Sequence, residues 1–195
     1  QHCTTTIQGG VVLRIPNVAD GKIDVSSLKY AEFTSVEIER IKLQTGDVLF
    51  VRTNGQRTLV GRCAVYRDVP ARAMFASYLI RARLDEELLN PDFLQSYTMT
   101  NAGHSHLSDK ATPAADGKFN INTKTIDTLL VPVPPLDEQE AAIKVFGSID
   151  QKLSVATAKK STLQDLFKTM LNKLMSGEIR VKALEIDESR SGILA

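Results

Sequence analysis

LVPVPPLDEQE, residues 130–140, is the stretch that decides the architecture, because a run of prolines gives way there to a helical pattern. Proline fixes its own φ and lacks the amide hydrogen that a helix interior needs, so these prolines predict extended backbone. Asp137, followed three residues later by Glu140, has the spacing of a capping box at the start of a helix. We expect a globular domain over residues 1–136, a helix over 138–175 within a spacer segment of 137–177, and a C-terminal tail of 178–195.

The expected helix carries an apolar stripe. Positions spaced alternately four and three residues apart between Ala142 and Leu174 are apolar except for Lys160. This spacing is typical of a coiled coil, and at 1.5 Å per residue the stripe would be roughly 50 Å long. Lys173 and Gly177 provide the expected helix end. We expect pairing with a second long helix, whereas packing on its own domain is the alternative. The expected pairing residues are Phe146, Ile149, Leu153, Leu163, Phe167, Met170 and Leu174.

Composition limits the class of protein. The 195 residues are 43% hydrophobic with a formal charge of +1, which is enough for one buried core in addition to the helix. No stretch approaches the roughly 18 apolar residues of a membrane span, and the polar N-terminus has no signal-peptide form. Cys3 and Cys63 are too few for a disulfide framework. We therefore expect a cytoplasmic protein without a membrane partner.

Arginines are concentrated in one segment. Residues 48–84 hold seven of them against a single acid, Asp68. The planar guanidinium group can bind a phosphate, or the O6/N7 edge of guanine, through two hydrogen bonds. The segment therefore indicates contact with nucleic acid, and the alternative is a solvated sheet face balanced by the acids at 85–87. These arginines are Arg52, Arg57, Arg62, Arg67, Arg72, Arg81 and Arg83.

The first half of the chain reads as short strands and tight turns. Strands are predicted at residues 11–15 and 22–25 around an Asp20-Gly21 turn, and at 47–53 and 58–66 around Asn54-Gly55. A two-residue turn at Asn54-Gly55 would place Arg52 opposite Arg57, and two facing guanidinium groups repel unless an anion lies between them. This tip, which includes Gln56, is a candidate for phosphate or base recognition. A looser turn that separates the two arginines is the alternative.

A polar segment follows the next predicted elements, a strand at 78–84 and a helix that starts at Asn90-Pro91 and continues to about Met99. Residues 100–122 read as an exposed connection, which could enter a DNA groove or merely link two elements. One helical turn and a final strand are predicted over 123–133. The candidate DNA-contacting residues from both segments are Arg52, Asn54, Gln56, Arg57, Arg62, His104, His106, Lys110, Lys118 and Asn120.

Several stretches resemble the specificity subunits of type I restriction-modification systems. They are the junction at 130–139 with the helix behind it, the helix end at 176–181, and the segments 15–21 and 46–52. The resemblance implies a mixed α+β target recognition domain with short twisted strands, followed by one long coiled-coil-forming helix. It also implies that the protein reads one half of a bipartite double-stranded DNA site and docks methyltransferase subunits and, through them, restriction subunits.

Members of that family usually hold two recognition domains and two long helices that pack antiparallel, whereas this chain holds one of each. The resemblance therefore implies either half of a longer subunit or a half-size subunit that pairs with a second copy.

Catalytic motifs are missing from the sequence. It has neither the Asn/Asp-Pro-Pro-aromatic loop nor the glycine-rich cofactor turn of an adenine methyltransferase, and no spaced set of metal ligands. We expect a subunit without catalytic residues, cofactor or metal of its own. A coiled-coil scaffold with a protein-binding head is the alternative; it explains the heptads equally well and the arginines less well.

Overall fold

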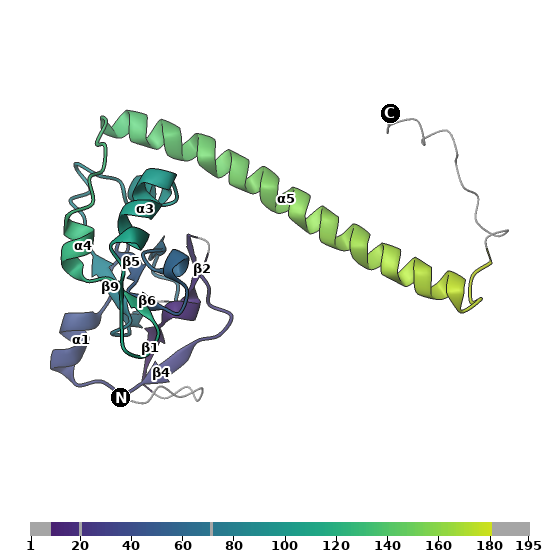
Figure 1. The fold of residues 1–195 in the computed structure, drawn as a ribbon, viewed down its shortest axis with the longest axis horizontal. Helices are drawn as coiled ribbons and strands as arrows, with labels where there is room; N and C mark the ends of the chain where they lie inside the picture. The colour runs from purple at the N-terminus through teal and green to yellow at the C-terminus, as the bar shows by residue number, and fades with distance from the viewer. Residues whose placement is uncertain (1–8, 20, 71, 181–195) are drawn as a thin grey trace. The chain divides into compact units, whose positions relative to one another are not determined.

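The computed structural model describes residues 9–19, 21–70 and 72–180. The chain divides into two compact units, Gln1–Lys144 and Val145–Ala195. The first unit combines short strands with four α-helices in its described part, and the second contains most of the long helix α5, Leu136–Met175 (Figure 1). This arrangement confirms the α+β class predicted from the sequence.

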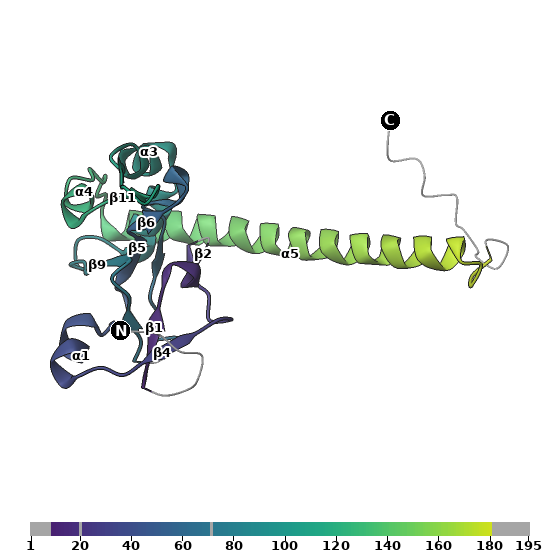
Figure 2. The same ribbon diagram turned by 60° about the horizontal axis from the view of Figure 1, so that its bottom comes forward.

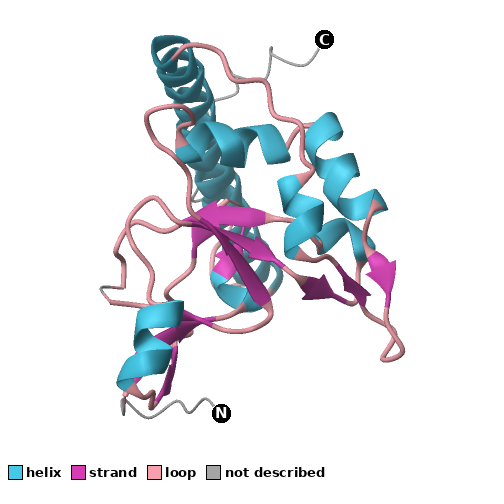
Figure 3. Ribbon diagram, turned by 90° about the vertical axis from the view of Figure 1, so that its left-hand side faces the viewer, coloured by secondary structure: helices cyan, strands magenta, loops and turns pink. Residues whose placement is uncertain are grey.

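A small antiparallel sheet forms the centre of the first unit. Strand β5, Val48–Val51, lies between β7, Cys63–Val65, and β9, Leu79–Ala82. Figure 3 distinguishes the strands of this unit from its helices by colour. All four residues of β5 are buried, so its sequence VLFV is continuously apolar rather than alternating. The strand predicted at 78–84 is therefore confirmed as β9, with shorter bounds.

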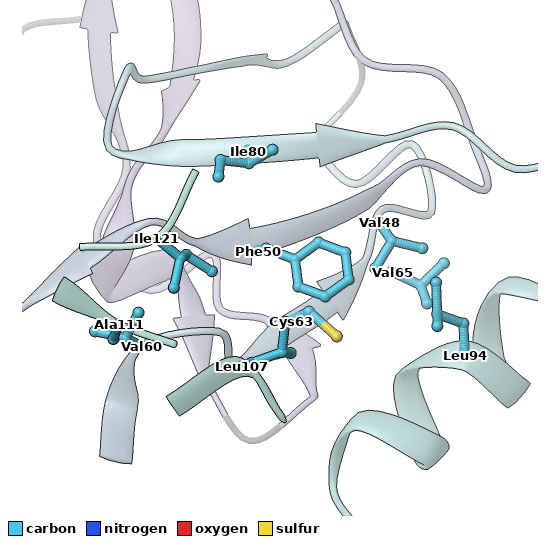
Figure 4. Packing of buried hydrophobic residues seen from close by; sticks show 10 residues of the cluster. All are labelled: Val48, Phe50, Val60, Cys63, Val65, Ile80, Leu94, Leu107, Ala111 and Ile121. Carbon is cyan, nitrogen blue, oxygen red and sulfur yellow. The ribbon is translucent and has the colours of Figure 1, made fainter. Parts of the chain in front are cut away.

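Two apolar cores pack around this sheet. One is made of Val48, Phe50, Val60, Cys63, Val65, Ile80, Leu94, Leu107, Ala111 and Ile121, and Figure 4 shows the Phe50 ring among its neighbours. The other contains Leu13, Val18, Leu43, Leu49, Val51, Ala64, Tyr66, Ala73 and Leu79. Alternate residues of β5 thus belong to opposite cores, as the alternation of side chains along a strand requires.

The two-residue turn predicted at Asn54-Gly55 is wrong, and the looser turn is correct. Strand β5 pairs with β7 in a register that sets Phe50 opposite Cys63. The connection between them contains β6, Thr53–Asn54, and the 3-10 helix η2, Arg57–Leu59. Because β6 pairs instead with β11, Phe119–Asn120, and η2 lets Val60 enter the core, Arg52 does not face Arg57 across a ladder.

The N-terminal strands also pair differently from the prediction. Strand β1, Gly10–Leu13, lies between β4, Lys29–Ala31, and β8, Met74–Phe75. Two shorter strands, β2, Val18–Ala19, and β3, Lys22–Ile23, pair with each other antiparallel. The predicted strand at 11–15 is cut short because Pro16 lies in a 3-10 helix, η1, Ile15–Asn17.

Three short helices follow the rules of capping. The threonine hydroxyl of Thr34 accepts a hydrogen bond from the N–H of Glu37 at the start of α1, Ser35–Ile41. In α2, Pro91–Thr98, the Asn90 side chain accepts from the N–H of Asp92 at 2.9 Å, which confirms the predicted cap. Helix α4, Thr123–Asp127, begins at Asn122 in the same way.

The prediction that residues 100–122 form an open connection is wrong. Residues Asn101–Asp109 form helix α3, and β10, Thr112–Pro113, pairs with β11. The Thr100 hydroxyl caps α3, and the side chain of Leu107 is only 1% exposed. A Cβ on Gly103 would lie 2.4 Å from the carbonyl oxygen of Tyr97, so the close approach of α3 to α2 requires glycine there. The Thr100 cap and the buried Leu107 side chain thus stabilise a helix in a segment of polar composition.

The final strand predicted before the proline run is absent: residues 129–135 are described and form no strand. Proline has no N–H to donate to a ladder, which explains the difference. The long helix predicted over 138–175 is confirmed as α5, an unbroken helix (Figure 2).

The ends of α5 differ in how well they match the prediction. The helix begins at Leu136, where the Pro135 carbonyl accepts from the N–H groups of Glu138 and Gln139. Asp137 therefore lies in the first turn rather than at the cap, where its negative charge still faces the positive end of the helix dipole. At the other end Gly177 has φ 74°, and its N–H donates to the Leu174 carbonyl, as predicted for a glycine stop.

The side chain of Gln139 is completely buried, although it lies in the most polar stretch of the helix start. Its Nε2 donates to the carbonyl oxygens of Leu88 at 3.0 Å and Pro134 at 2.8 Å. Its Oε1 accepts from the N–H of Asn90 at 2.9 Å. The amide thus joins the proline junction and the first turn of α5 to the loop before α2.

We predict that Gln139→Ala lowers the free energy of unfolding by about 1–3 kcal/mol, because two carbonyl groups and one N–H lose a buried partner. Glu138→Ala, at an exposed position of the same turn, is the matched control and should change stability by less than about 0.5 kcal/mol. Urea unfolding followed by circular dichroism measures both. Equal stability of the two variants would contradict the structural role of the amide.

Candidate nucleic-acid interface

The pairing of β6 with β11 brings together the two segments that sequence reasoning selected separately. In the small sheet β10-β11-β6, Asn54 lies opposite Phe119, and Asn120 lies opposite Thr53. Lys118 immediately precedes β11, and Gln56 is an exposed residue two positions after Asn54. Three of the candidate side-chain amides and one candidate lysine therefore belong to one small sheet and its adjoining turns.

Two local contacts shape the turn after β6. The Asn54 Oδ1 accepts from the N–H of Gln56 at 3.0 Å, which stabilises a tight local turn. The guanidinium group of Arg57 lies 5.6 Å from the centre of the Phe119 ring. It also donates to the carbonyl oxygens of Asp109 and Ala111, at 3.1 and 3.0 Å. Arg57 thus joins η2 to the end of α3 and has a structural role besides its charge.

Helix α3 places the candidate histidines beside this sheet. A hydrogen bond of 2.8 Å joins the Nε2 of His104 to the Thr58 carbonyl oxygen in η2. The Lys110 Nζ lies 3.2 Å from the Nε2 of His106, and both contact the hydroxyl of Thr128. This part of the polar segment is therefore a helix that packs on η2, rather than a free loop.

Other groups of the protein hold several of the clustered arginines, Arg57 among them. Arg83 donates two hydrogen bonds to Asp47, at 2.7 and 2.8 Å, and this contact raises the pKa of Arg83. Arg67 pairs with Asp92, while Arg81 donates to the Lys42 carbonyl and lies over the Phe75 ring. The acidic partners of Arg83 and Arg67 are thus Asp47 and Asp92, rather than the acids at 85–87 that the alternative invoked.

Three arginines of the segment, Arg52, Arg62 and Arg72, are exposed. Arg52 makes a long contact of 3.5 Å with the Ser77 carbonyl oxygen. It also connects β5 to β6, so its charge lies next to the small sheet. The exposed positive charge available to a ligand at this sheet therefore comes chiefly from Arg52, together with Lys110 and Lys118.

An acidic neighbour moderates the charge of Lys118. Its Nζ lies 2.9 Å from a carboxylate oxygen of Asp116, and this hydrogen bond raises the pKa of Lys118 and lowers that of Asp116. Lys118 thus stays protonated near neutral pH, but a phosphate would have to compete with Asp116 for it.

Cys63 belongs to the core rather than to a reactive site. Burial raises the pKa of its thiol to about 12, and the sulfur lies 3.2 Å from the Thr98 hydroxyl oxygen. The thiolate that a nucleophile or a metal ligand requires is therefore disfavoured. Cys3 lies outside the described residues. Within the described ranges, no group of three or more His, Cys, Asp or Glu side chains could hold a metal ion.

The second unit presents the apolar stripe of α5. Phe146, Ile149, Leu153, Leu163 and Phe167 are each at least half exposed, while Met170 and Leu174 are partly buried. Val145, Val155, Leu166 and Leu171 are further exposed apolar residues of the same helix that the heptad reading did not include. Exposed apolar area of this extent on one helix is typical of a surface that contacts another molecule or segment. None of the described helices is long and apolar enough to cross a membrane.

Sequence comparison connects these features with known proteins. The chain is 27% identical over 179 residues to the type I restriction enzyme EcoKI specificity subunit of Escherichia coli K12, a match covering 88% of this chain and 38% of that protein. A putative type I restriction enzyme MjaX specificity subunit from Methanocaldococcus jannaschii is 26% identical over 169 residues, covering 86% and 39%. No family model matches the chain.

A solved structure has the same fold. The HsdS subunit from Thermoanaerobacter tengcongensis superposes with a TM-score of 0.63 at 16% sequence identity, over 92% of this chain and 45% of that one. The chain thus spans less than half the length of the relatives it matches. These matches do not favour the alternative of a coiled-coil scaffold with a protein-binding head.

Proposed function

We propose that this chain, which belongs to the specificity subunits of type I restriction-modification systems, reads one half of a bipartite DNA target. In this proposal residues 1–136 form the target recognition domain, 137–177 form a spacer helix, and 178–195 form a tail. The pairing of β6 with β11 carries the proposal, because it gathers amide and cationic side chains at one small sheet.

The side chains around that sheet suit the two tasks of DNA recognition. Asparagine and glutamine amides can pair with adenine through two hydrogen bonds, and arginine can pair in the same way with guanine. Lysine and arginine neutralise phosphates and so position the protein along the duplex. We assign base recognition to Gln56 and Asn120 and phosphate contacts to Arg52, Lys110 and Lys118. Asn54, Arg57, Arg62, His104 and His106 complete the proposed surface.

The chemistry of the system belongs to the partner subunits in this proposal. The chain would dock methyltransferase subunits and, through them, restriction subunits, while contributing no catalytic group or cofactor of its own. The exposed apolar stripe of α5 would pair with a second long helix. That helix comes either from a second copy, which would read two half-sites with two-fold symmetry, or from the other half of a longer subunit.

We predict different effects for the two kinds of DNA contact in the complex assembled with methyltransferase subunits. Gln56→Ala should cost roughly 1–3 kcal/mol at one base position, and Lys118→Ala should weaken binding to all sequences and reduce the salt slope by about one. Duplex binding at several salt concentrations and sequencing of the methylated sites measure these effects. Lys22→Ala, an exposed lysine of β3, is the control for charge loss. Unchanged affinity, slope and methylated site in both variants would place the DNA surface elsewhere.

We predict that a charge in the stripe of α5 prevents pairing. Phe146→Asp and Phe167→Asp each place a carboxylate among apolar side chains of the proposed interface, so both should abolish self-association without unfolding the first unit. Gln151→Asp adds the same charge outside the stripe and should keep the wild-type mass. Light scattering measures the result. A dimeric wild type with unchanged mass in both phenylalanine variants would refute the role of the stripe, and a monomeric wild type would exclude a second copy as the partner.

A further inference from the structure

A second basic site lies in the first unit, outside the residues assigned above to base recognition. It is a surface hollow of about 740 Å³ between β1, α1 and the segment before β9. Three arginines from three different elements line it: Arg14 after β1, Arg40 in α1, and Arg52 between β5 and β6. Aromatic side chains complete the lining, namely Phe33, Phe75 and Tyr78.

The lining of this hollow has a net positive charge, because three arginines stand against one acid, Glu37. The Glu37 carboxylate accepts hydrogen bonds from the N–H and the hydroxyl of Thr34, at 2.8 and 2.9 Å. Guanidinium groups that share one hollow repel each other, and an anion between them would turn this repulsion into attraction. The hollow is therefore suited to a negatively charged ligand.

Arg14 supplies an independent observation. Its Nε is buried, and no hydrogen-bond acceptor for it is present among the described residues. A buried guanidinium N–H without a partner is unfavourable, and in native proteins such a group is usually satisfied by another protein group, an ordered water or an ion. Because this Nε is closed to solvent, an anion in the hollow would satisfy it once the Arg14 side chain turns toward the hollow.

The hollow adjoins the proposed recognition sheet. The N–H of Arg52 donates to the carbonyl oxygen of Tyr78 at 3.0 Å, and the Arg52 carbonyl accepts from the N–H of Ile121, directly after β11, at 2.9 Å. Arg52 thus connects the lining of the hollow to the strands that carry Asn54 and Asn120. A DNA strand that contacts the sheet would pass within reach of this residue.

We propose that the hollow holds a phosphate group of the DNA backbone, bound by Arg14, Arg40 and Arg52. The inference rests on the proposed DNA recognition and adds a contact that fixes the position of the strand without reading its sequence. The side chains of Phe33, Phe75 and Tyr78 provide apolar surface for the adjoining sugar, while the guanidinium groups bind the phosphate oxygens.

The test uses Arg14→Ala and Arg40→Ala in the assembled methyltransferase complex, with Lys22→Ala as the control for charge loss. Each arginine variant should weaken binding of the recognised duplex and of an unrelated duplex by the same factor, about tenfold. Each should also reduce the salt slope by about one and leave the methylated sequence unchanged. Arg40 is exposed on α1, so Arg40→Ala decides the result if Arg14→Ala does not fold.

Three outcomes would overturn the inference. If the folded variants keep the affinity and the salt slope of the wild type, the hollow does not bind a DNA phosphate. If the methylated sequence changes, the hollow contacts bases instead. If the arginine variants lose the binding of adenosine monophosphate but bind the duplex as the wild type does, the hollow binds the phosphate of a free nucleotide rather than of DNA. If the wild-type complex binds DNA without sequence preference, the proposed function is refuted. The affinity of the two variants for duplex DNA would still show whether the hollow binds phosphate.

Discussion

The buried amide of Gln139 is the contact on which the start of the long helix depends. Proline cannot donate a backbone hydrogen bond, so a junction rich in proline must be held by other groups. The Gln139 side chain provides these hydrogen bonds. Its Nε2 donates to the carbonyl oxygens of Pro134 and Leu88, and its Oε1 accepts from the N–H of Asn90. The helix start and the loop before α2 therefore form one hydrogen-bonded unit.

The features that could be predicted from the sequence are those set by local rules. The long helix follows from its apolar spacing, its glycine end from the backbone freedom of Gly177, and the start of α2 from the preference of Asn90 for a cap. Each depends on residues close together in the chain. The candidate DNA residues also follow from local composition, which indicates two separate polar segments. The pairing of β6 with β11 makes these segments neighbours.

The features that could not be predicted depend on long-range pairing. Asn54-Gly55 has the composition of a tight hairpin, but the partner of β6 lies more than sixty residues further along the chain, and only the pairing reveals it. The segment with α3 is polar, and its buried Leu107 side chain, which packs in the core, is not apparent from the composition. Gln139 stands in a run of charged residues and looks no different from its neighbours. Arg14 and Arg40 are far apart in the sequence, and only the fold brings both into the lining of one hollow.

Photo-crosslinking of the assembled complex to its recognised duplex, followed by mass spectrometry of the attached peptides, shows whether the small sheet lies against DNA. We expect crosslinks within residues 52–57 and 104–120, which lie around the small sheet β10-β11-β6. We also expect that an excess of unlabelled duplex of the same sequence removes them more effectively than an unrelated duplex. Crosslinks confined to other parts of the first unit, or equal competition by both duplexes, would contradict the proposal that this sheet reads DNA.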